Sequence, residues 1–173
     1  MSTESTELAL EENDTLTQFQ ALGLDMRALN AVTRLALNAP TDVQREAIPP
    51  FMRGRDVVAT APTGTGKTLA FLLPLLSRLS LPAKGSGPGP RAIILSPTRE
   101  LALQTWTVCS DLCKSMKMAP PLLLVGGGNS GKSGGVNHRP VTEDLKTFRR
   151  EANDIIIGTP GRMEDVLTRY SVL

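Results

Sequence analysis

The sequence is poor in aromatic side chains, which make up 3% of its 173 residues, with one Trp and one Tyr. A packed interior must therefore be mostly aliphatic, and the 40% of hydrophobic residues is enough to build one for a single domain. The two cysteines, Cys109 and Cys113, are spaced to share one helix face, where they cannot easily bridge each other. Because His138 is the single histidine, we expect no zinc site and interpret both thiols as small buried hydrophobes.

Long apolar runs are also missing. The longest, Leu69–Leu76, is far too short to span a membrane. Residues 1–18 carry five acidic residues and no Lys or Arg, so no secretory signal is expected. We predict a disordered acidic tail over residues 1–16 and a soluble, intracellular, monomeric protein without membrane contact. All 19 Lys and Arg lie in residues 19–173, and such a mildly basic body fits a polyanionic partner.

Helical periodicity begins near Thr17, breaks at Gly23 and stops before Pro40, since a residue before proline is pushed out of the helical basin. A helix capped by Thr41 or Asp42 follows at 43–51, which the prolines at 49 and 50 should shorten. Further helices are predicted at 66–79, 100–116, 142–151 and 161–170. In the third of these, Thr142, Asp144 and Lys146 should lie on the polar side.

Strands are predicted at 56–60, 91–96, 121–125 and 154–158, each short and apolar. Apolar strands that alternate with helices indicate an α/β fold, with a parallel sheet and helices on both of its faces. Ligands then bind at the carboxyl ends of the strands.

Two Gly-rich runs resemble a phosphate-binding loop. The strict G-x-x-x-x-G-K-[ST] pattern occurs at 126–133, but Gly134, Gly135 and Pro140 forbid a helix after its lysine. Without that helix the backbone amides are not aligned on an anion, so we interpret this run as a chance match in a flexible insertion. The run 61–68 departs from the pattern at its first position, yet it lies between a predicted strand and an apolar helix.

The run 61–68 is therefore predicted to hold the phosphates of a nucleotide, with ATP as the favoured candidate. Gly64 and Gly66 allow close backbone approach, and Lys67 supplies a full charge to the terminal phosphates. The hydroxyl of Thr68 can bind Mg²⁺. Lys67 and Thr68 are the candidate catalytic residues.

Five segments, read in order, resemble the motifs of DEAD-box RNA helicases. Besides 61–68, the run 40–44 (PTDVQ) is similar to the adenine-reading segment, with Phe19 upstream at a matching distance. The runs 97–102 (PTRELA, with Gln104) and 159–162 (TPGR) resemble the two RNA-contact segments, and 126–127 the double glycine. Five matches in one order are specific, and together they cover roughly residues 19–173.

The resemblance implies a RecA-like P-loop NTPase lobe of an ATP-dependent RNA helicase, with ATP and Mg²⁺ as cofactors. It implies sequence-independent binding to the RNA backbone, with Arg99 and Arg162 best suited to bidentate phosphate contact. The amide of Gln44 can both donate to and accept from the adenine edge. The implied nucleotide-binding residues are Phe19, Leu37, Thr41, Gln44, Ala61, Pro62, Thr63, Gly64, Thr65, Gly66, Lys67 and Thr68. The implied RNA-binding residues are Pro97, Thr98, Arg99, Gly126, Gly127, Thr159, Pro160, Gly161 and Arg162.

Three segments, Ile48–Arg53, Lys67–Pro74 and Gly158–Val166, are more specifically similar to the branch of the family that acts on ribosomal RNA during large-subunit assembly. That similarity implies pre-ribosomal particles as partners and a nucleolar or nuclear location. The sequence also departs from the family, because Ala36 and Leu37 replace a Gly–aromatic pair. Leu37 can pack on adenine but cannot stack on it, so the base should be held more weakly.

The Asp-Glu-Ala-Asp segment of the family and its second lobe do not occur within residues 1–173. We therefore expect an incomplete sheet and a chain that binds ATP weakly without hydrolysing it, since hydrolysis needs an acid on Mg²⁺ and a facing cation. The alternative is a truncated, non-catalytic module that binds ATP and RNA. An unrelated phosphate-loop kinase would explain neither 97–99 nor 159–162. The continuation of the reading frame would separate the first two hypotheses.

Overall fold

The computed structural model of the protein describes residues 15–80, 90–126, 141–150 and 153–171. The chain forms two compact units. Unit 1 contains residues up to Ala83 together with Ser115–Met118, and unit 2 contains the rest. Most of the predicted acidic tail lies outside the described residues, but residues 15 and 16, which we assigned to it, already belong to the first helix. No helix in the described ranges has the length and apolar character needed to cross a membrane.

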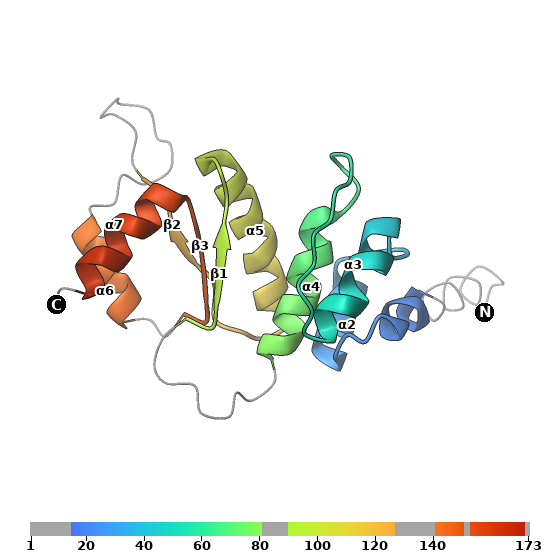
Figure 1. Ribbon diagram of the computed structural model, residues 1–173. Helices are drawn as coiled ribbons and strands as arrows, with labels where there is room; N and C mark the ends of the chain where they lie inside the picture. Colours follow the sequence, from blue (N-terminus) through green and yellow to red (C-terminus); the bar gives the residue numbers. More distant parts are fainter. Residues whose placement is uncertain (1–14, 81–89, 127–140, 151–152, 172–173) are drawn as a thin grey trace. The chain divides into compact units, whose positions relative to one another are not determined.

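Unit 1 is helical in its described residues. A helix at 15–21 is followed by α2 (Met26–Arg34), α3 (Asp42–Met52) and α4 (Lys67–Leu79), as Figure 1 shows. Gly23 separates the first two at φ +88°, in agreement with the break predicted from the sequence. Helix α4 packs against both α2 and α3. The core between these helices is aliphatic apart from one ring, and its fully buried members include Phe19, Val32, Ile48, Leu72, Leu73 and Leu76.

The prediction that two prolines shorten α3 was wrong. The helix runs through Pro49 and Pro50 to Met52. Proline removes a backbone donor, but its carbonyl can still accept. Arg53 N donates to Pro49 O at 3.2 Å and Arg55 N to Pro50 O at 3.1 Å, so the last turn still closes.

The strand predicted at 56–60 is not formed. In the described part of the chain the sheet contains three other strands, and none of them pairs with this segment. Val58 is 99% exposed, although its residue type favours a half-buried sheet. A cavity of about 480 Å³ lies between α3 and this segment, with Asp42, Glu46 and Asp56 among its lining residues. Strand propensity alone does not supply a hydrogen-bonded neighbour, which explains the failure of the prediction.

The end of α2 has the hydrogen bonds of a Schellman motif. Ala36 N donates to Thr33 O at 3.0 Å and Leu37 N donates to Val32 O at 3.2 Å. This motif places the residue after the C-cap in the left-handed region, and Ala36 has φ +48° there. Glycine is the usual residue at that position, because it has no Cβ to clash. The alanine that departs from the family pattern therefore lies in a backbone conformation that suits glycine.

We expect Ala36→Gly to raise the free energy of unfolding by about 0.5–1 kcal/mol. A left-handed conformation costs a non-glycine residue about 1–2 kcal/mol, and the greater freedom of glycine in the unfolded chain offsets part of the gain. Urea unfolding followed by circular dichroism would measure the change. Asn30→Gly is the control, because Asn30 is exposed within α2. It should lower stability by about 0.5 kcal/mol, and a loss of stability in Ala36→Gly would contradict the prediction.

Unit 2 is built on a parallel sheet of β1 (Ala92–Leu95), β2 (Leu122–Leu124) and β3 (Ile155–Gly158), in the order β1-β3-β2. Helix α5 (Arg99–Ser115) lies on one side of the sheet, and α6 (Val141–Arg150) and α7 (Pro160–Ser171) lie on the other (Figure 1). This arrangement confirms the predicted α/β fold. The central strand β3 is buried along its whole length.

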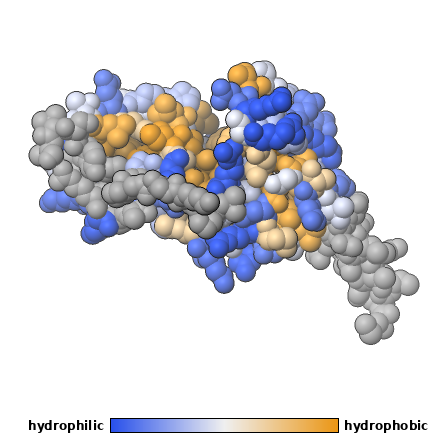
Figure 2. All heavy atoms as spheres, turned by 60° about the horizontal axis from the view of Figure 1, so that its bottom comes forward, coloured by the Kyte–Doolittle hydropathy of each residue, from blue (hydrophilic) through white to orange (hydrophobic). Residues whose placement is uncertain are grey.

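Packing in unit 2 joins α7 to the sheet through one cluster: Leu122, Leu124, Ile156, Met163 and Val166. On the edge strand β1, by contrast, Ile93 and Leu95 are 51% and 60% exposed. Figure 2 shows apolar areas of this kind on one face of the molecule, among hydrophilic ones. Cys109 and Cys113 are buried and unbridged on α5, as predicted. A hydrogen bond with Cys113, together with burial, raises the pKa of the Cys109 thiol.

Candidate functional site

The predicted phosphate loop leads directly into a helix. Helix α4 begins at Lys67, and its N-cap Gly66 has φ +87°. Gly64 is also left-handed, at φ +81°. Both glycines therefore stand where L side chains are strained, as a loop that turns its amides toward an anion requires. The strict textual match at 126–133 lies outside the described residues apart from Gly126.

The lysine of the loop is held by the carbonyl oxygens of the loop. Lys67 Nζ donates to Ala61 O and, at 2.5 Å, to Pro62 O. Thr65 Oγ1 donates to Pro62 O at 2.8 Å, so the loop is closed on itself. The positive charge of Lys67 therefore lies at the N-terminus of α4. The helix dipole is also positive there, so both favour a bound anion. Thr68 follows in the first turn of α4.

Gln44 connects the predicted adenine-reading segment to this loop. Its Oε1 accepts Thr41 N at 3.1 Å, and its Nε2 donates to Gly66 O at 3.2 Å. Gln44 is 3% exposed, so both contacts are screened from water. The hydroxyl oxygen of Thr41, the N-cap residue of α3, is buried without a hydrogen-bond partner. A methyl group at Gly66 would lie 2.5 Å from Gln44 Nε2, which accounts for glycine at this position.

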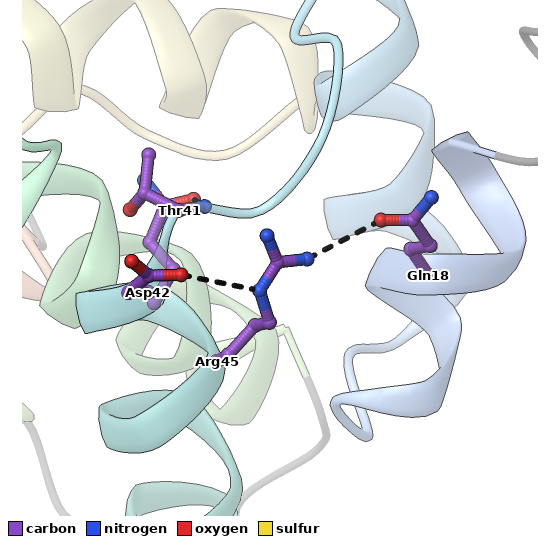
Figure 3. Close-up of polar contacts among 5 residues, drawn as sticks. Gln18, Thr41, Asp42 and Arg45 are labelled. Carbon is purple, nitrogen blue, oxygen red and sulfur yellow. Dashed lines mark hydrogen bonds and ion pairs between the residues drawn. The ribbon is translucent and has the colours of Figure 1, made fainter.

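The two apolar residues predicted to contact adenine differ in accessibility. Phe19 is 1% exposed and forms part of the core of unit 1. Leu37 is half-buried, at the position that the Schellman motif fixes. Next to Phe19 in the chain, Gln18 contacts the guanidinium of Arg45, which also faces Asp42 (Figure 3). Arg45 Nη1 donates to Gln18 Oε1 at 3.4 Å, and Arg45 Nε lies 3.7 Å from Asp42 Oδ1. These contacts are exposed, so they position the helix at 15–21 only weakly against α3.

The segments predicted to bind RNA meet at one edge of the sheet in unit 2. Gly158, the last residue of β3, is in register with Leu95 of β1 and Leu124 of β2. All three strands are parallel, so the chain leaves each of them at the same edge. The segments that follow begin at Ser96, Val125 and Thr159. Ser96 N donates to Gly158 O at 2.9 Å and Thr159 N to Leu124 O at 3.1 Å, which ties adjacent segments together.

Two of these segments are also close through side chains. A Cβ added at Gly126 would lie 3.8 Å from a terminal nitrogen of Arg99, so the arginine reaches toward the glycine segment. Arg99 is exposed at the start of α5, and Thr98 Oγ1 accepts Leu101 N at 3.3 Å. Gly127, the second predicted glycine, lies outside the described residues.

Arg162 has a different environment from Arg99. Its Nη2 lies 2.6 Å from Asp144 Oδ2, and its Nε donates to the same oxygen at 2.8 Å. The two side chains are 8% and 3% exposed. The prediction that Asp144 lies on the polar side of α6 was therefore wrong: its partner is a buried guanidinium on α7. No local pattern indicates this pairing, because the two residues come from different helices.

Comparison with known proteins bears on both sites. The family model of the DEAD/DEAH box helicases matches residues 41–172. The chain belongs to this family. The chain is 42% identical over 146 residues to a protein of Neurospora crassa named ATP-dependent RNA helicase dbp-10, covering 83% of the chain and 14% of that protein. It is 37% identical over 158 residues to a protein of Mycosarcoma maydis named pre-mRNA-processing ATP-dependent RNA helicase PRP5. That match covers 90% of the chain and 12% of that protein. The chain thus spans a small part of the length of these relatives.

A solved structure gives the same result for the fold. The structure of Mss116p bound to ssRNA and AMP-PNP matches with a TM-score of 0.75 and 33% identity, covering 91% of this chain and 30% of that one. The α/β fold expected from the family resemblance is therefore confirmed. Among the described residues, no group of three or more His, Cys, Asp or Glu could hold a metal ion.

Proposed function

We propose that this chain provides the ATP-binding loop and part of the RNA-binding surface of an ATP-dependent RNA helicase. One observation carries the proposal: three parallel strands deliver the three predicted RNA-contact segments to a single sheet edge. These segments present hydroxyl, guanidinium and backbone N–H groups, which bind phosphates without reading bases. The RNA-bound state of the Mss116p structure supports RNA as the ligand.

ATP is the proposed nucleotide and Mg²⁺ the proposed metal. The loop fits the phosphates of the nucleotide, because left-handed Gly64 and Gly66 precede Lys67 at the start of α4. When bound, the Mg²⁺ ion would neutralise phosphate charge, with Thr68 as its protein ligand. To read the adenine edge, the amide of Gln44 must exchange its contacts with Thr41 N and Gly66 O for the base, against which Leu37 would pack. To bind the phosphates, the ammonium of Lys67 must likewise exchange the carbonyls of Ala61 and Pro62 for phosphate oxygens.

We expect the chain to bind ATP and single-stranded RNA without hydrolysing ATP. No RNA-stimulated phosphate release should be seen, because hydrolysis needs an acid on the metal as well as a phosphate-binding loop. Fluorescence anisotropy with labelled RNAs of unrelated sequences, together with a phosphate-release assay, tests this. Similar affinities for all RNAs support the proposal, and absence of RNA binding contradicts it. Measurable hydrolysis would refute only the non-catalytic part.

We propose ribosomal RNA as the finer substrate class. It rests on the similarity of Ile48–Arg53, Lys67–Pro74 and Gly158–Val166 to that branch of the family. The competing class is precursor messenger RNA, which the name of the PRP5 relative specifies for that protein. Sedimentation of the tagged protein with pre-ribosomal particles, in a nuclear extract, would favour the first class. Recovery of spliceosomal RNA instead would favour the second.

Arg99→Gln should weaken RNA binding and lower its salt dependence. If Arg99 contacts one phosphate, the slope of log affinity against log salt should become shallower by about 0.7, the value per phosphate contact for single-stranded nucleic acid. Titrations at several salt concentrations give that slope. Arg169→Gln is a matched control, because Arg169 is exposed in the last turn of α7, away from the strand ends. An unchanged slope for Arg99→Gln would remove Arg99 from the proposed surface.

A further inference from the structure

The buried pair formed by Arg162 and Asp144 raises a question that the proposed RNA surface leaves open. Arg162 belongs to a segment proposed to bind phosphate, yet its side chain is only 8% exposed and is directed to a carboxylate. Both Nη2 and Nε converge on Asp144 Oδ2, at 2.6 Å and 2.8 Å. A guanidinium with its charge neutralised by a contact that close is a poor phosphate ligand.

The neighbouring backbone indicates what the pair can do instead. Helix α7 begins at Pro160, and Met163 N donates to Thr159 O at 3.0 Å in its first turn. Pro160 and Gly161 are exposed, while the next side chain, Arg162, turns inward. Asp144 comes from α6, which packs on α7. The ion pair therefore joins the first turn of α7 to α6 on its buried side. The exposed backbone of the turn remains at the sheet edge.

We propose that Asp144 and Arg162 are positioning residues that hold residues 159–161 in place for RNA, and that the guanidinium itself does not contact phosphate. This inference rests on the proposed RNA-binding function. Its physical basis is that breaking a buried ion pair is strongly destabilising, so the structure around it must rearrange. The rearranged part would be the RNA-contact turn that carries Arg162.

The two alternatives predict different effects of Asp144→Asn on RNA affinity. If the guanidinium contacts phosphate, removing the carboxylate frees its charge, and RNA affinity should rise or stay the same. If the pair positions the turn, Asp144→Asn should lower affinity, by about tenfold or more as for other broken buried pairs. Glu143→Gln is the control, because Glu143 is an exposed acid on the same helix. It removes the same charge without touching the pair.

A double variant tests whether the charge is needed at all. Asp144→Leu combined with Arg162→Met replaces the pair by apolar side chains of similar size, which buried pairs often tolerate. Affinity within about twofold of wild type, with an unchanged salt slope, supports positioning. A slope lowered by about 0.7, as expected for Arg99→Gln, shows a lost phosphate contact and overturns the proposal.

The experiment is anisotropy titration of a labelled single-stranded RNA against the full chain and these variants. Circular dichroism sets a temperature at which each variant is folded. Should the double variant fail to fold, the sign of the Asp144→Asn effect decides alone. Lower affinity for Asp144→Asn beside normal affinity for Glu143→Gln supports the proposal, and equal or higher affinity overturns it. If the wild-type chain binds no RNA, the proposed function fails and this inference falls with it; wild-type binding separates the two failures.

Discussion

Replacing Lys67 by Ala should weaken ATP binding by about 10- to 150-fold, from the roughly 1.5–3 kcal/mol of a hydrogen bond to a charged group. Lys67 is the cation of the loop that opens α4, and its Nζ is already placed at the loop by two carbonyl oxygens. Because the chain is expected to bind ATP weakly, such a loss should bring binding below detection. Titration with a fluorescent ATP analogue would measure it.

Two controls make this result specific. Lys114→Ala removes an exposed lysine near the end of α5 and should leave ATP affinity unchanged. Adenosine has no phosphates, so its affinity should be the same for wild type and Lys67→Ala. An equal loss for adenosine and ATP would point to damage to the fold. Unchanged ATP affinity would contradict the assignment of the phosphate loop.

Gln44→Glu should make stability depend on pH, because it keeps one contact of Gln44 and removes the other. A glutamate at this position can still accept from Thr41 N, but an ionised carboxylate cannot donate to Gly66 O. Burial and the facing carbonyl should raise the pKa of the introduced carboxyl in the folded state. A raised folded pKa means that stability is retained at low pH and lost as pH rises through that pKa.

The expected loss at about pH 8 is roughly 1–3 kcal/mol, the cost of a buried group without its hydrogen bond, and it should shrink toward about pH 5. Urea unfolding followed by circular dichroism at both pH values measures it. Gln44→Ala loses both contacts and should be destabilised at each pH. Gln104→Glu, an exposed glutamine on α5, should show neither effect. A Gln44→Glu variant as stable as wild type at high pH would argue against the contact with Gly66.

Most elements could be predicted from the sequence, because their signals are local. The helix that opens at Lys67 follows from glycines ahead of an apolar run, and the break before α2 follows from Gly23. The RNA-contact segments could be assigned to strand ends for the same reason. That β3 lies between the other two strands, which brings the segments together, required the sheet order.

What could not be predicted depends on partners distant in sequence. The segment at 56–60 has the composition of a strand, but a strand exists only when a neighbour pairs with it. Asp144 has the spacing of a solvent-facing residue on α6, and its burial is decided by Arg162 on another helix. The left-handed φ of Ala36 is not evident from the residue type, since alanine rarely takes that conformation, although glycine stands at this position in the family pattern.

The segment at 56–60 has a consequence for the protein in solution. It carries β-branched side chains, it is not paired with a strand of the described sheet, and Val58 is almost fully exposed. Unpaired backbone groups of this kind are a template on which another extended chain can add. Intermolecular pairing rises with protein concentration, so aggregation would start here before the core unfolds. Affinities measured in dilute solution would then describe a different species from the one present in concentrated stocks.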